Sequence, residues 1–177
     1  MKPPETFKSS RLLLRLPTMD DAELIFQKYA QDPEVSKYLS WRPHENIDVT
    51  REFLRRCIQR WKDETAFPWV IAIKDDNTLL GMIEIRIHKF HADFGYGIAR
   101  QYWDHGYTTE AATIVIQWAL EQLSIYRVWA ICDVENVAST RVMEKAGMQR
   151  EGILRRFTIH PNISSEPRDC FCYSVVK

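Results

Sequence analysis

The sequence predicts an α+β fold, with a mixed and mostly antiparallel sheet of about seven strands flanked by about four helices. Short apolar segments typical of strands are separated by longer segments whose apolar residues recur at helical spacing. The turn sequence Asp75-Asp76-Asn77 joins two strand-like segments, which favours antiparallel pairing. No linker-like run of Gly, Ser or Pro interrupts the chain, so we expect residues 1–177 to form one domain.

The N-terminal part contains a strand and two amphipathic helices. Arg11–Leu16 is the predicted strand, and Thr18 is placed to cap a helix that ends at the Asp32-Pro33 step. A second helix follows Asp48, with its apolar residues on one side. The segment that joins these helices, Tyr38–Arg42, is aromatic. We call it the connector.

Three strands follow as a meander, over Trp69–Lys74, Leu79–His88 and Ala92–Arg100. The third strand carries Gly95 and Gly97 on one face, which leaves that face almost bare of side chains. Glycines inside a strand often mark a place where a ligand or another backbone comes close. We therefore expect a ligand beside this strand.

The most informative segment runs from Trp103 to Ala112, where a polar loop reaches Gly106 and enters the helix Tyr107–Leu123. The first N–H groups of a helix lack intrahelical partners, and the helix dipole adds partial positive charge there. Such a terminus can hold a phosphate without a lysine. The segment predicts a site for a phosphorylated cofactor, the alternative being that Gly106 serves only as a turn.

The C-terminal part supplies the remaining strands and one short helix. Val128–Cys132 is apolar without alternation, as expected of a central strand covered on both faces. A helix spans Asn136–Lys145, and Gly147 suits its left-handed C-terminal cap. The strands Ile153–Ile159 and Asp169–Val176 complete the sheet.

Composition and charge limit the partners and the compartment. Lys plus Arg number 24 and so do Asp plus Glu, which gives no reason to expect nucleic acid or an anionic membrane as a partner. The four cysteines lie in apolar segments without CxxC pairs, and we expect buried thiols in a reducing compartment. No signal-like or membrane-spanning stretch is present. We expect a cytoplasmic protein that is a monomer or a homodimer.

Two segments together resemble the GNAT superfamily of N-acetyltransferases. GYGIARQYWDHGYTTEA, residues 95–111, is similar to the family's strand, pyrophosphate loop and helix. RVWAICDVENVASTRVMEKAGMQREG, residues 127–152, is similar to the following strand and its Asn-initiated helix. The RLLLR strand at residues 11–15, Leu39-Ser40-Trp41 and the Asn136-to-Ser139 step resemble the subgroup that contains the ribosomal-protein N-terminal (alanine/serine) acetyltransferases. The resemblance implies a GNAT fold, acetyl-CoA as the donor and direct transfer of acetyl to a primary amine.

The chain departs from the family pattern at two places. Trp103 stands where the loop usually begins with Gln or Arg, and Thr108 stands at the last small position of the loop. Met143 occupies the position where many relatives have a tyrosine general acid, and a thioether cannot donate a proton. These departures keep open a non-catalytic acyl-CoA-binding module as an alternative function.

The resemblance implies which residues hold acetyl-CoA. The pyrophosphate is expected on backbone groups of the loop and first helical turn, with the pantetheine arm along the end of the third meander strand and beside Asn136. A backbone N–H of the Gly97–Arg100 edge is expected to meet the thioester oxygen. The expected cofactor-binding residues are Ile98, Ala99, Arg100, Gln101, Asp104, His105, Gly106, Tyr107, Thr108, Asn136 and Ser139.

Catalysis needs a group that removes a proton from the amine and one that protonates the leaving thiolate. Ser139 is the candidate proton donor, and the alternative is that Asn136 and Ser139 merely satisfy backbone groups at a helix start. Glu84 is the candidate base, because it shares with Met82, Arg86 and His88 the strand face that in related folds looks toward the acceptor amine. The alternative is a solvated carboxylate or a structural one next to Arg86. Asp93 and His91 are further candidates acting through a water.

The acceptor is the least defined part of this assignment. Tyr38, Trp41 and Arg42 of the connector are expected to line the acceptor site together with Glu84, the alternative being that the aromatic residues only cover the core. The resemblance implies a primary amine as the acceptor, and we expect either a protein N-terminus or a small molecule such as a polyamine, an aminoglycoside or an amino acid derivative. His88 and His91 have no third ligand pattern nearby, so no metal is expected.

Overall fold

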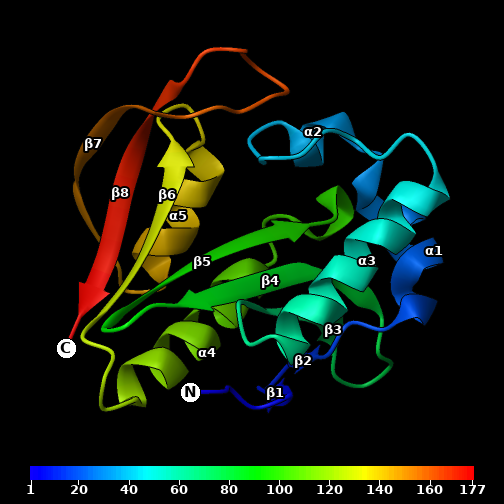
Figure 1. Ribbon diagram of the computed structural model, residues 1–177, viewed down its shortest axis with the longest axis horizontal. Coiled ribbons are helices and arrows are strands. Elements are labelled where there is room, and N and C mark those ends of the chain that lie inside the picture. The colour runs from blue at the N-terminus through cyan, green and yellow to red at the C-terminus, as the bar shows by residue number, and fades with distance from the viewer.

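An eight-stranded sheet organises the structure, a computed structural model that describes residues 1–177 (Figure 1). The strand order is β1-β2-β3-β4-β5-β6-β8-β7, and every neighbouring pair is antiparallel except β5 and β6. The strands are β1 (Thr6–Lys8), β2 (Leu12–Arg15), β3 (Phe67–Ile73), β4 (Leu79–Ile87), β5 (His91–Ile98), β6 (Arg127–Asp133), β7 (Gln149–Thr158) and β8 (Arg168–Val176). The predicted mixed sheet is confirmed, with one additional strand, β1.

Helices pack on both faces of this sheet. They are α1 (Ala22–Ile25), α2 (Pro33–Ser36), α3 (Ile47–Lys62), α4 (Tyr107–Glu121) and α5 (Val137–Lys145). The apolar sides of α4 and α5 pack in the larger core on one face, and α1 and α3 pack in a smaller core on the other. Figure 1 shows that α1 to α3 lie over the β3–β5 half only. The β6–β8 part of their face is therefore free of helices.

The first predicted helix is interrupted in the structure. Met19–Asp21 forms a 3₁₀ turn, α1 follows, and Phe26–Ala30 continues as a π-helical turn. The predicted end near Asp32-Pro33 is confirmed, but the chain then starts α2 at Pro33, where the Asp32 side chain accepts a hydrogen bond from the Glu34 N–H at 2.9 Å. Proline is favoured at a first helical position because its missing N–H would have no partner there.

The expectation that Val128–Cys132 is covered on both faces is wrong. Along β6, Val128, Ala130 and Cys132 are buried against the α4 and α5 side, whereas Trp129 and Ile131 are only half-buried. The reason is the limited reach of α1 to α3, which leaves the second face of β6 without a covering layer. An apolar run alone does not distinguish these two situations.

The parallel pair β5 and β6 is joined over a short distance only. Residues His91–Asp93 pair with Arg127–Trp129, and beyond this point the two strands diverge while β5 continues to Ile98 (Figure 1). The right-handed crossover through α4 connects them. We call the opening between Phe94–Ile98 and Ala130–Asp133 the strand gap.

The cysteines are buried, as predicted. All four are free thiols, and burial raises the pKa of Cys57 and Cys132 to about 12, so these two remain protonated at neutral pH. No helix is long and apolar enough to span a bilayer.

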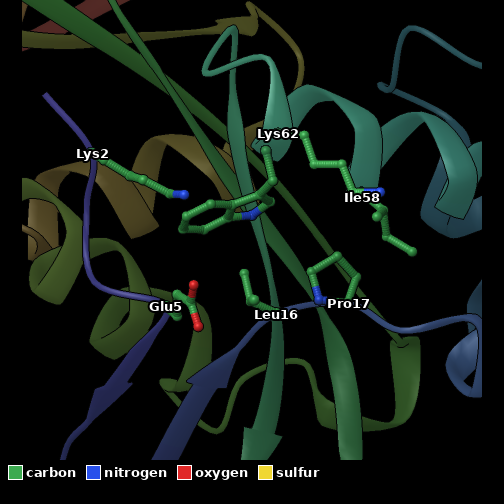
Figure 2. A pocket seen from close by; sticks show the side chains of 7 residues that line it. Lys2, Glu5, Leu16, Pro17, Ile58 and Lys62 are labelled. Atoms are coloured by element: carbon green, nitrogen blue, oxygen red, sulfur yellow. The ribbon is translucent and has the colours of Figure 1, made fainter.

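A shallow hollow beside α3, shown in Figure 2, lies at the β2 edge, three strands away from β5 and the strand gap. It is lined by Lys2, Glu5, Leu16, Pro17, Ile58, Trp61 and Lys62.

Candidate functional site

The strand pairing of β4 and β5 places the two candidate catalytic groups on opposite faces of the sheet. Glu84 pairs with Gly95 and Ile83 pairs with Tyr96. Directly opposed residues of an antiparallel pair project to the same face, so Glu84 and Gly95 face the α1–α3 side, and Tyr96 faces the α4–α5 side. Ser139 belongs to α5, on the Tyr96 side. The strand gap is the place where the two faces meet.

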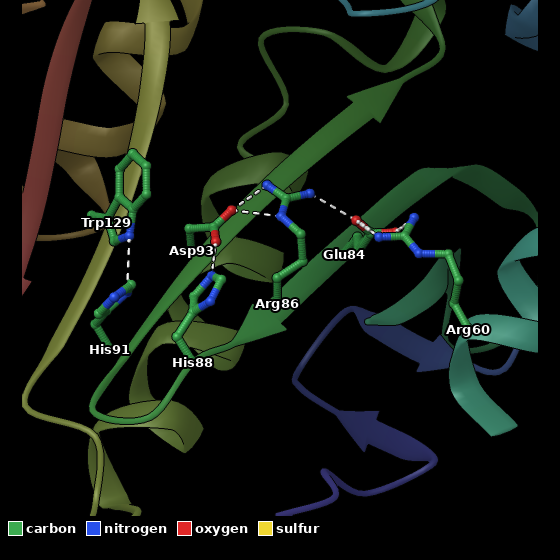
Figure 3. A network of polar contacts seen from close by, with 7 residues as sticks. All are labelled: Arg60, Glu84, Arg86, His88, His91, Asp93 and Trp129. Carbon is green, nitrogen blue, oxygen red and sulfur yellow. Dashed lines mark hydrogen bonds and ion pairs between the residues drawn. The ribbon is translucent and has the colours of Figure 1, made fainter. Parts of the chain in front are cut away.

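A chain of charged side chains runs across the Glu84 face (Figure 3). Arg60 of α3 donates to both oxygens of Glu84, at 2.7 and 3.0 Å, and Arg86 donates to one of them at 2.7 Å. Arg86 also binds Asp93 through two nitrogens, and the second Asp93 oxygen lies 2.8 Å from His88 Nε2. The predicted common face of Glu84 and Arg86 is confirmed. The contact between them is the one that the structural alternative to a catalytic base requires.

His91 lies at the end of this charged chain. Trp129 Nε1 donates to His91 Nδ1 at 3.4 Å, and the His91 ring lies tilted beside the His88 ring with centroids 4.6 Å apart. The contact joins β5 to β6 where the two strands are still paired. His91 therefore lies at the closed end of the strand gap.

Open space lies over Gly95, next to Glu84. A methyl group added at Gly95 would meet no atom within 4 Å, whereas one at Gly97 would lie 3.4 Å from Leu39 Cδ1 of the connector. The connector therefore covers β5 at Gly97 and leaves it uncovered at Gly95. The bare glycine face thus lies beside open space at Gly95 and beneath the connector at Gly97.

The loop before α4 has an open helix N-terminus. Gly106 has φ 77°, in the left-handed region that glycine tolerates, and no side chain caps the helix. The first intrahelical bond runs from the Glu110 N–H to the Gly106 carbonyl, so earlier amides have no intrahelical partner. The expected phosphate-binding residues, Asp104, His105, Gly106, Tyr107 and Thr108, are consecutive, and all but Tyr107 and Thr108 are exposed.

Arg11 holds this loop from outside, a role that the sequence did not reveal. Its guanidinium forms an ion pair with Glu110 at 2.7 Å, donates to the His105 carbonyl at 3.1 Å and lies 4.6 Å from the Tyr107 ring centre. Burial acts to raise the pKa of Glu110, but hydrogen bonds from Ser9 and Arg11 lower it overall, so the carboxylate stays charged. Arg11 is the first residue of the RLLLR strand motif, and this motif was the only feature of the sequence that drew attention to it.

Trp103, the unexplained residue of the loop, folds back onto β5. Its indole Nε1 donates to the Ile98 carbonyl at 2.9 Å. The neighbouring Ala99 N–H donates to Leu80 on β4, so strand alternation turns the backbone groups of Ile98 toward the strand gap. The indole therefore ties the loop to the gap edge. The flanking Arg100 pairs with Asp32 at 3.2 Å, and Gln101 is exposed.

The start of α5 supports both readings of its polar residues. Asn136 is the N-cap, and its side-chain oxygen accepts from the Ser139 N–H at 3.1 Å, as the structural alternative requires. The Ser139 hydroxyl, however, makes no local backbone bond and lies 2.6 Å from the Tyr96 hydroxyl. Met143 is fully buried in the core, so it does not face the strand gap.

The connector meets the loop between β7 and β8. Asn162 of that loop donates to the Ser36 and Trp41 carbonyls, both at 2.7 Å, and the ring of Tyr38 packs edge-on against His160. Arg42 is exposed and makes no hydrogen bond or ion pair. A shallow hollow on the α1–α3 face of the sheet, over β6 to β8, is lined by His91, Arg127, Trp129, Leu154, Phe157 and Cys172.

Asp133 fixes the turn that leads into α5. Its side chain is fully buried and accepts from Arg168 at 2.6 and 3.1 Å and from the Glu135 N–H at 3.0 Å. Burial acts to raise the pKa of Asp133, but the bonds from Arg168 and Glu135 lower it overall. The folded state thus favours the ionised form, and this stabilisation is present above the pKa of the unfolded chain and lost as the pH falls.

We predict that Asp133→Ala lowers the free energy of unfolding by about 2 kcal/mol near neutral pH, because Arg168 and the Glu135 N–H lose a buried acceptor while Arg168 keeps its ion pair with Glu135. The difference from the wild type should begin to shrink below about pH 4, where Asp133 becomes protonated in the unfolded chain, and should continue to shrink as the pH falls toward the lowered pKa of the folded carboxylate. Denaturant unfolding from pH 7 down to pH 3 measures both effects. Asp48→Ala, which removes an exposed helix ion pair with Arg51, is the control and should change stability little. A difference that stayed constant with pH would contradict the assignment.

Comparisons with known proteins agree with this geometry. The family model described as an acetyltransferase (GNAT) domain matches residues 11–149. YoaA of Bacillus subtilis strain 168, an uncharacterized N-acetyltransferase, is 29% identical to this chain over 174 residues. The alignment covers 96% of each of the two chains. A solved structure from Vibrio cholerae, provisionally named a ribosomal-protein-serine acetyltransferase, is 27% identical with a TM-score of 0.86 and 100% of both chains covered.

The fold extends to a more distant solved structure. RimL, a ribosomal L7/L12 alpha-N-protein acetyltransferase solved in complex with coenzyme A, shares 18% identity and a TM-score of 0.85. The alignment covers 97% of this chain and 98% of that one. At this identity the likeness concerns the fold.

Proposed function

Because this chain belongs to the GNAT acetyltransferase family, we propose that it transfers the acetyl group of acetyl-CoA directly to a primary amine, with a protein N-terminal amine as the acceptor. The observation that carries the proposal is the placement of Ser139 at the strand gap and of Glu84 on the opposite face of the sheet, on β4 beside Gly95 of the strand that borders the gap. A donor on the α4–α5 side and an amine on the α1–α3 side would meet there without passing each other.

The residues present fit acetyl-CoA as the donor. The uncapped N-terminus of α4 offers unpaired amides to a pyrophosphate. Arg100 and Gln101 enter this loop, and the backbone of Ile98 and Ala99 leads from it along the strand gap. Asn136 uses its side-chain oxygen as a helix cap, which leaves its amide N–H groups for the pantetheine arm. RimL, which has the same fold, was solved with coenzyme A.

Each chemical task has a candidate group in this arrangement. The bound donor supplies an acetyl group activated as a thioester. Glu84, or a water held by Glu84, Asp93 or His91, takes the proton that the amine loses as its nitrogen attacks the acetyl carbon. The Ile98 N–H, which alternation turns toward the strand gap, is the candidate donor to the carbonyl oxygen. Ser139 gives a proton to the sulfur as the carbon–sulfur bond breaks.

The surroundings of Glu84 favour transfer through a water. Its two oxygens already accept three hydrogen bonds from arginine guanidinium groups, so only one lone-pair position, on Oε2, stays open for direct contact with an ammonium. The open space over Gly95 adjoins Glu84 and leaves room for the amine and a water. A relay through water needs no change in the charged chain of Figure 3.

The shape of the acceptor side favours a peptide over a small amine. Tyr38, Trp41 and Arg42 of the connector border one end, and the helix-free β6–β8 face with its hollow at Trp129 continues from it. An extended chain needs such an open surface beyond its first residue. The name of the Vibrio cholerae structure, a ribosomal-protein-serine acetyltransferase, agrees with this acceptor class.

The test measures thiol release from acetyl-CoA with a panel of peptides that differ in the first residue, and with polyamines, aminoglycosides and amino acid derivatives. We expect turnover with unblocked peptides and none with the same peptides acetylated at the N-terminus. Turnover with small amines alone would identify a small-molecule acetyltransferase. Calorimetric binding of acetyl-CoA without turnover would identify a non-catalytic module, and no binding would exclude all three functions.

A variant at Gly95 tests the assignment of faces. Gly95→Leu is expected to fill the open space beside Glu84, lowering kcat/KM for the amine at least tenfold while leaving acetyl-CoA affinity within about twofold. Gly152→Ala on β7, where an added methyl group also meets no atom within 4 Å, is the control. If Gly95→Leu lost acetyl-CoA binding, our proposal would have assigned the donor to the wrong face of the sheet.

A further inference from the structure

Tyr96 and Ser139 form the only side-chain hydrogen bond that links β5 to α5. The two hydroxyl oxygens lie 2.6 Å apart, although β5 and α5 belong to the two arms that diverge at the strand gap. Neither hydroxyl has another hydrogen-bond partner in the structure. The pair therefore stands by itself at the place where the proposed function puts the leaving sulfur.

The chemistry of the two hydroxyl groups decides which one donates. A phenol is a much stronger hydrogen-bond donor than an aliphatic alcohol, so the Tyr96 O–H is expected to donate to Ser139 Oγ. Burial raises the pKa of Tyr96, with the hydrogen bond to Ser139 acting in the opposite direction, so the phenol stays protonated at neutral pH. With Tyr96 as donor, the Ser139 proton is free to point at another acceptor.

The position of Tyr96 is held by packing. Its ring stacks on Phe94 with centroids 6.1 Å apart, and it projects from the strand face opposite to Gly95 and Gly97. Alternation along β5 fixes this direction, because a shift by one residue would move the phenol to the other face. Tyr96 thus reaches Ser139 from a rigid strand, across the gap.

We infer that Tyr96 is a positioning residue for acetyl transfer, which acts through Ser139 and replaces the phenol that Met143 does not provide. This inference rests on the proposed function. As the carbon–sulfur bond breaks, its electron pair stays on sulfur, and the Ser139 proton forms the new S–H bond. The Tyr96 proton moves toward Ser139 Oγ in the same step and stabilises the charge that develops on this oxygen. The proton lost by the amine returns through solvent and restores the pair.

The acidity of the groups supports a pair over a lone serine. General acid catalysis is most effective when the donor and the receiving group have similar proton affinities. The receiving thiol has a pKa of about 8.5. Burial raises the pKa of Tyr96 above the value of about 10 for a free tyrosine, but a serine hydroxyl does not ionise at all in the range accessible to proteins, so the phenol is still the better matched acid. A serine that receives a proton from a phenol as it gives one to sulfur avoids a free alkoxide.

The test compares Tyr96→Phe, Ser139→Ala and the double variant. Tyr96→Phe keeps the stacked ring and is expected to lower kcat about tenfold, with KM for acetyl-CoA within about twofold of the wild type. The double variant should be no slower than Ser139→Ala, because the phenol acts only through the serine. Tyr173→Phe, which removes a buried hydroxyl bonded to Glu144 at 2.9 Å, is the matched control.

A second measurement responds to the proton and not to packing. Fluorotyrosines of decreasing phenol pKa, introduced at position 96 alone, should change kcat progressively and shift its pH dependence to lower pH, whereas a structural role predicts no trend. This series also serves if Tyr96→Phe folds poorly. An unchanged kcat in Tyr96→Phe beside a slow Ser139→Ala, or additive effects in the double variant, would overturn the inference and leave the proposed function intact. A wild-type protein that acetylates no amine would overturn the proposed function itself.

Discussion

Replacement of Ser139 by alanine is expected to lower kcat for acetyl transfer about a hundredfold, the lower range of what a general acid contributes. The Ser139 hydroxyl is free of local backbone bonds and lies at the strand gap, so its loss removes a proton donor and leaves the loop before α4 untouched. KM for acetyl-CoA should stay within about twofold, because the pyrophosphate contacts come from backbone amides. Steady-state thiol release with a saturating amine measures both constants.

The neighbouring hydroxyl provides the control for this prediction. Thr140 also lies on α5, but its hydroxyl donates to the Val137 carbonyl within the helix at 2.7 Å. Thr140→Ala should therefore leave kcat unchanged. Equal rates for Ser139→Ala and the wild type would show that the serine takes no part in the chemistry. They would favour the alternative that Asn136 and Ser139 only satisfy backbone groups at the start of α5.

Replacement of Gly81 by alanine is expected to lower the free energy of unfolding by about 3 kcal/mol or more, the upper range for overpacking. An added Cβ would lie 2.2 Å from the Gly97 carbonyl oxygen and 2.7 Å from Ile98 Cα, both backbone atoms of β5. Because backbone atoms cannot rotate away as a flexible side chain can, β4 and β5 would have to separate. Denaturant unfolding of the variant and the wild type measures the cost.

Gly95→Ala is the matched control for stability, since it adds the same methyl group to the paired strand where nothing lies within 4 Å. Its unfolding free energy should equal that of the wild type or exceed it slightly, because glycine in a strand costs conformational entropy. Where the Gly81 variant still folds, its acetyl-CoA affinity should also fall, because the displaced Gly97 and Ile98 line the strand gap. A stability loss of similar size in both variants would contradict the clash.

The parts of this molecule that were predictable from the sequence are those that local chemistry determines. A glycine before a helical segment predicted the open start of α4, which is present, with Gly106 in the left-handed conformation. Asn136 likewise caps α5 with its side chain, and Gly147 has the left-handed conformation predicted for it. Alternation along β4 and β5 correctly assigned Glu84 and Arg86 to one face.

The features that could not be predicted depend on contacts between distant segments. Arg11 meets Glu110 across 99 residues, and Tyr96 meets Ser139 only because two strands diverge and a helix returns between them. The coverage of β6 was misjudged for the same reason, since it depends on where α1 to α3 end. The π-helical turn at Phe26–Ala30 has no residue pattern that distinguishes it from an ordinary helix.

The placement of Ser139 and Glu84 on opposite faces of one sheet has a kinetic consequence under the proposed function. The two substrates would enter from separate sides and be present together, so the acetyl group would never need to rest on the protein. Initial rates measured at several concentrations of each substrate would then give intersecting double-reciprocal lines, and each product would leave by the side on which its substrate entered. The sheet would thus act as a partition that coenzyme A and the acetylated amine never have to cross.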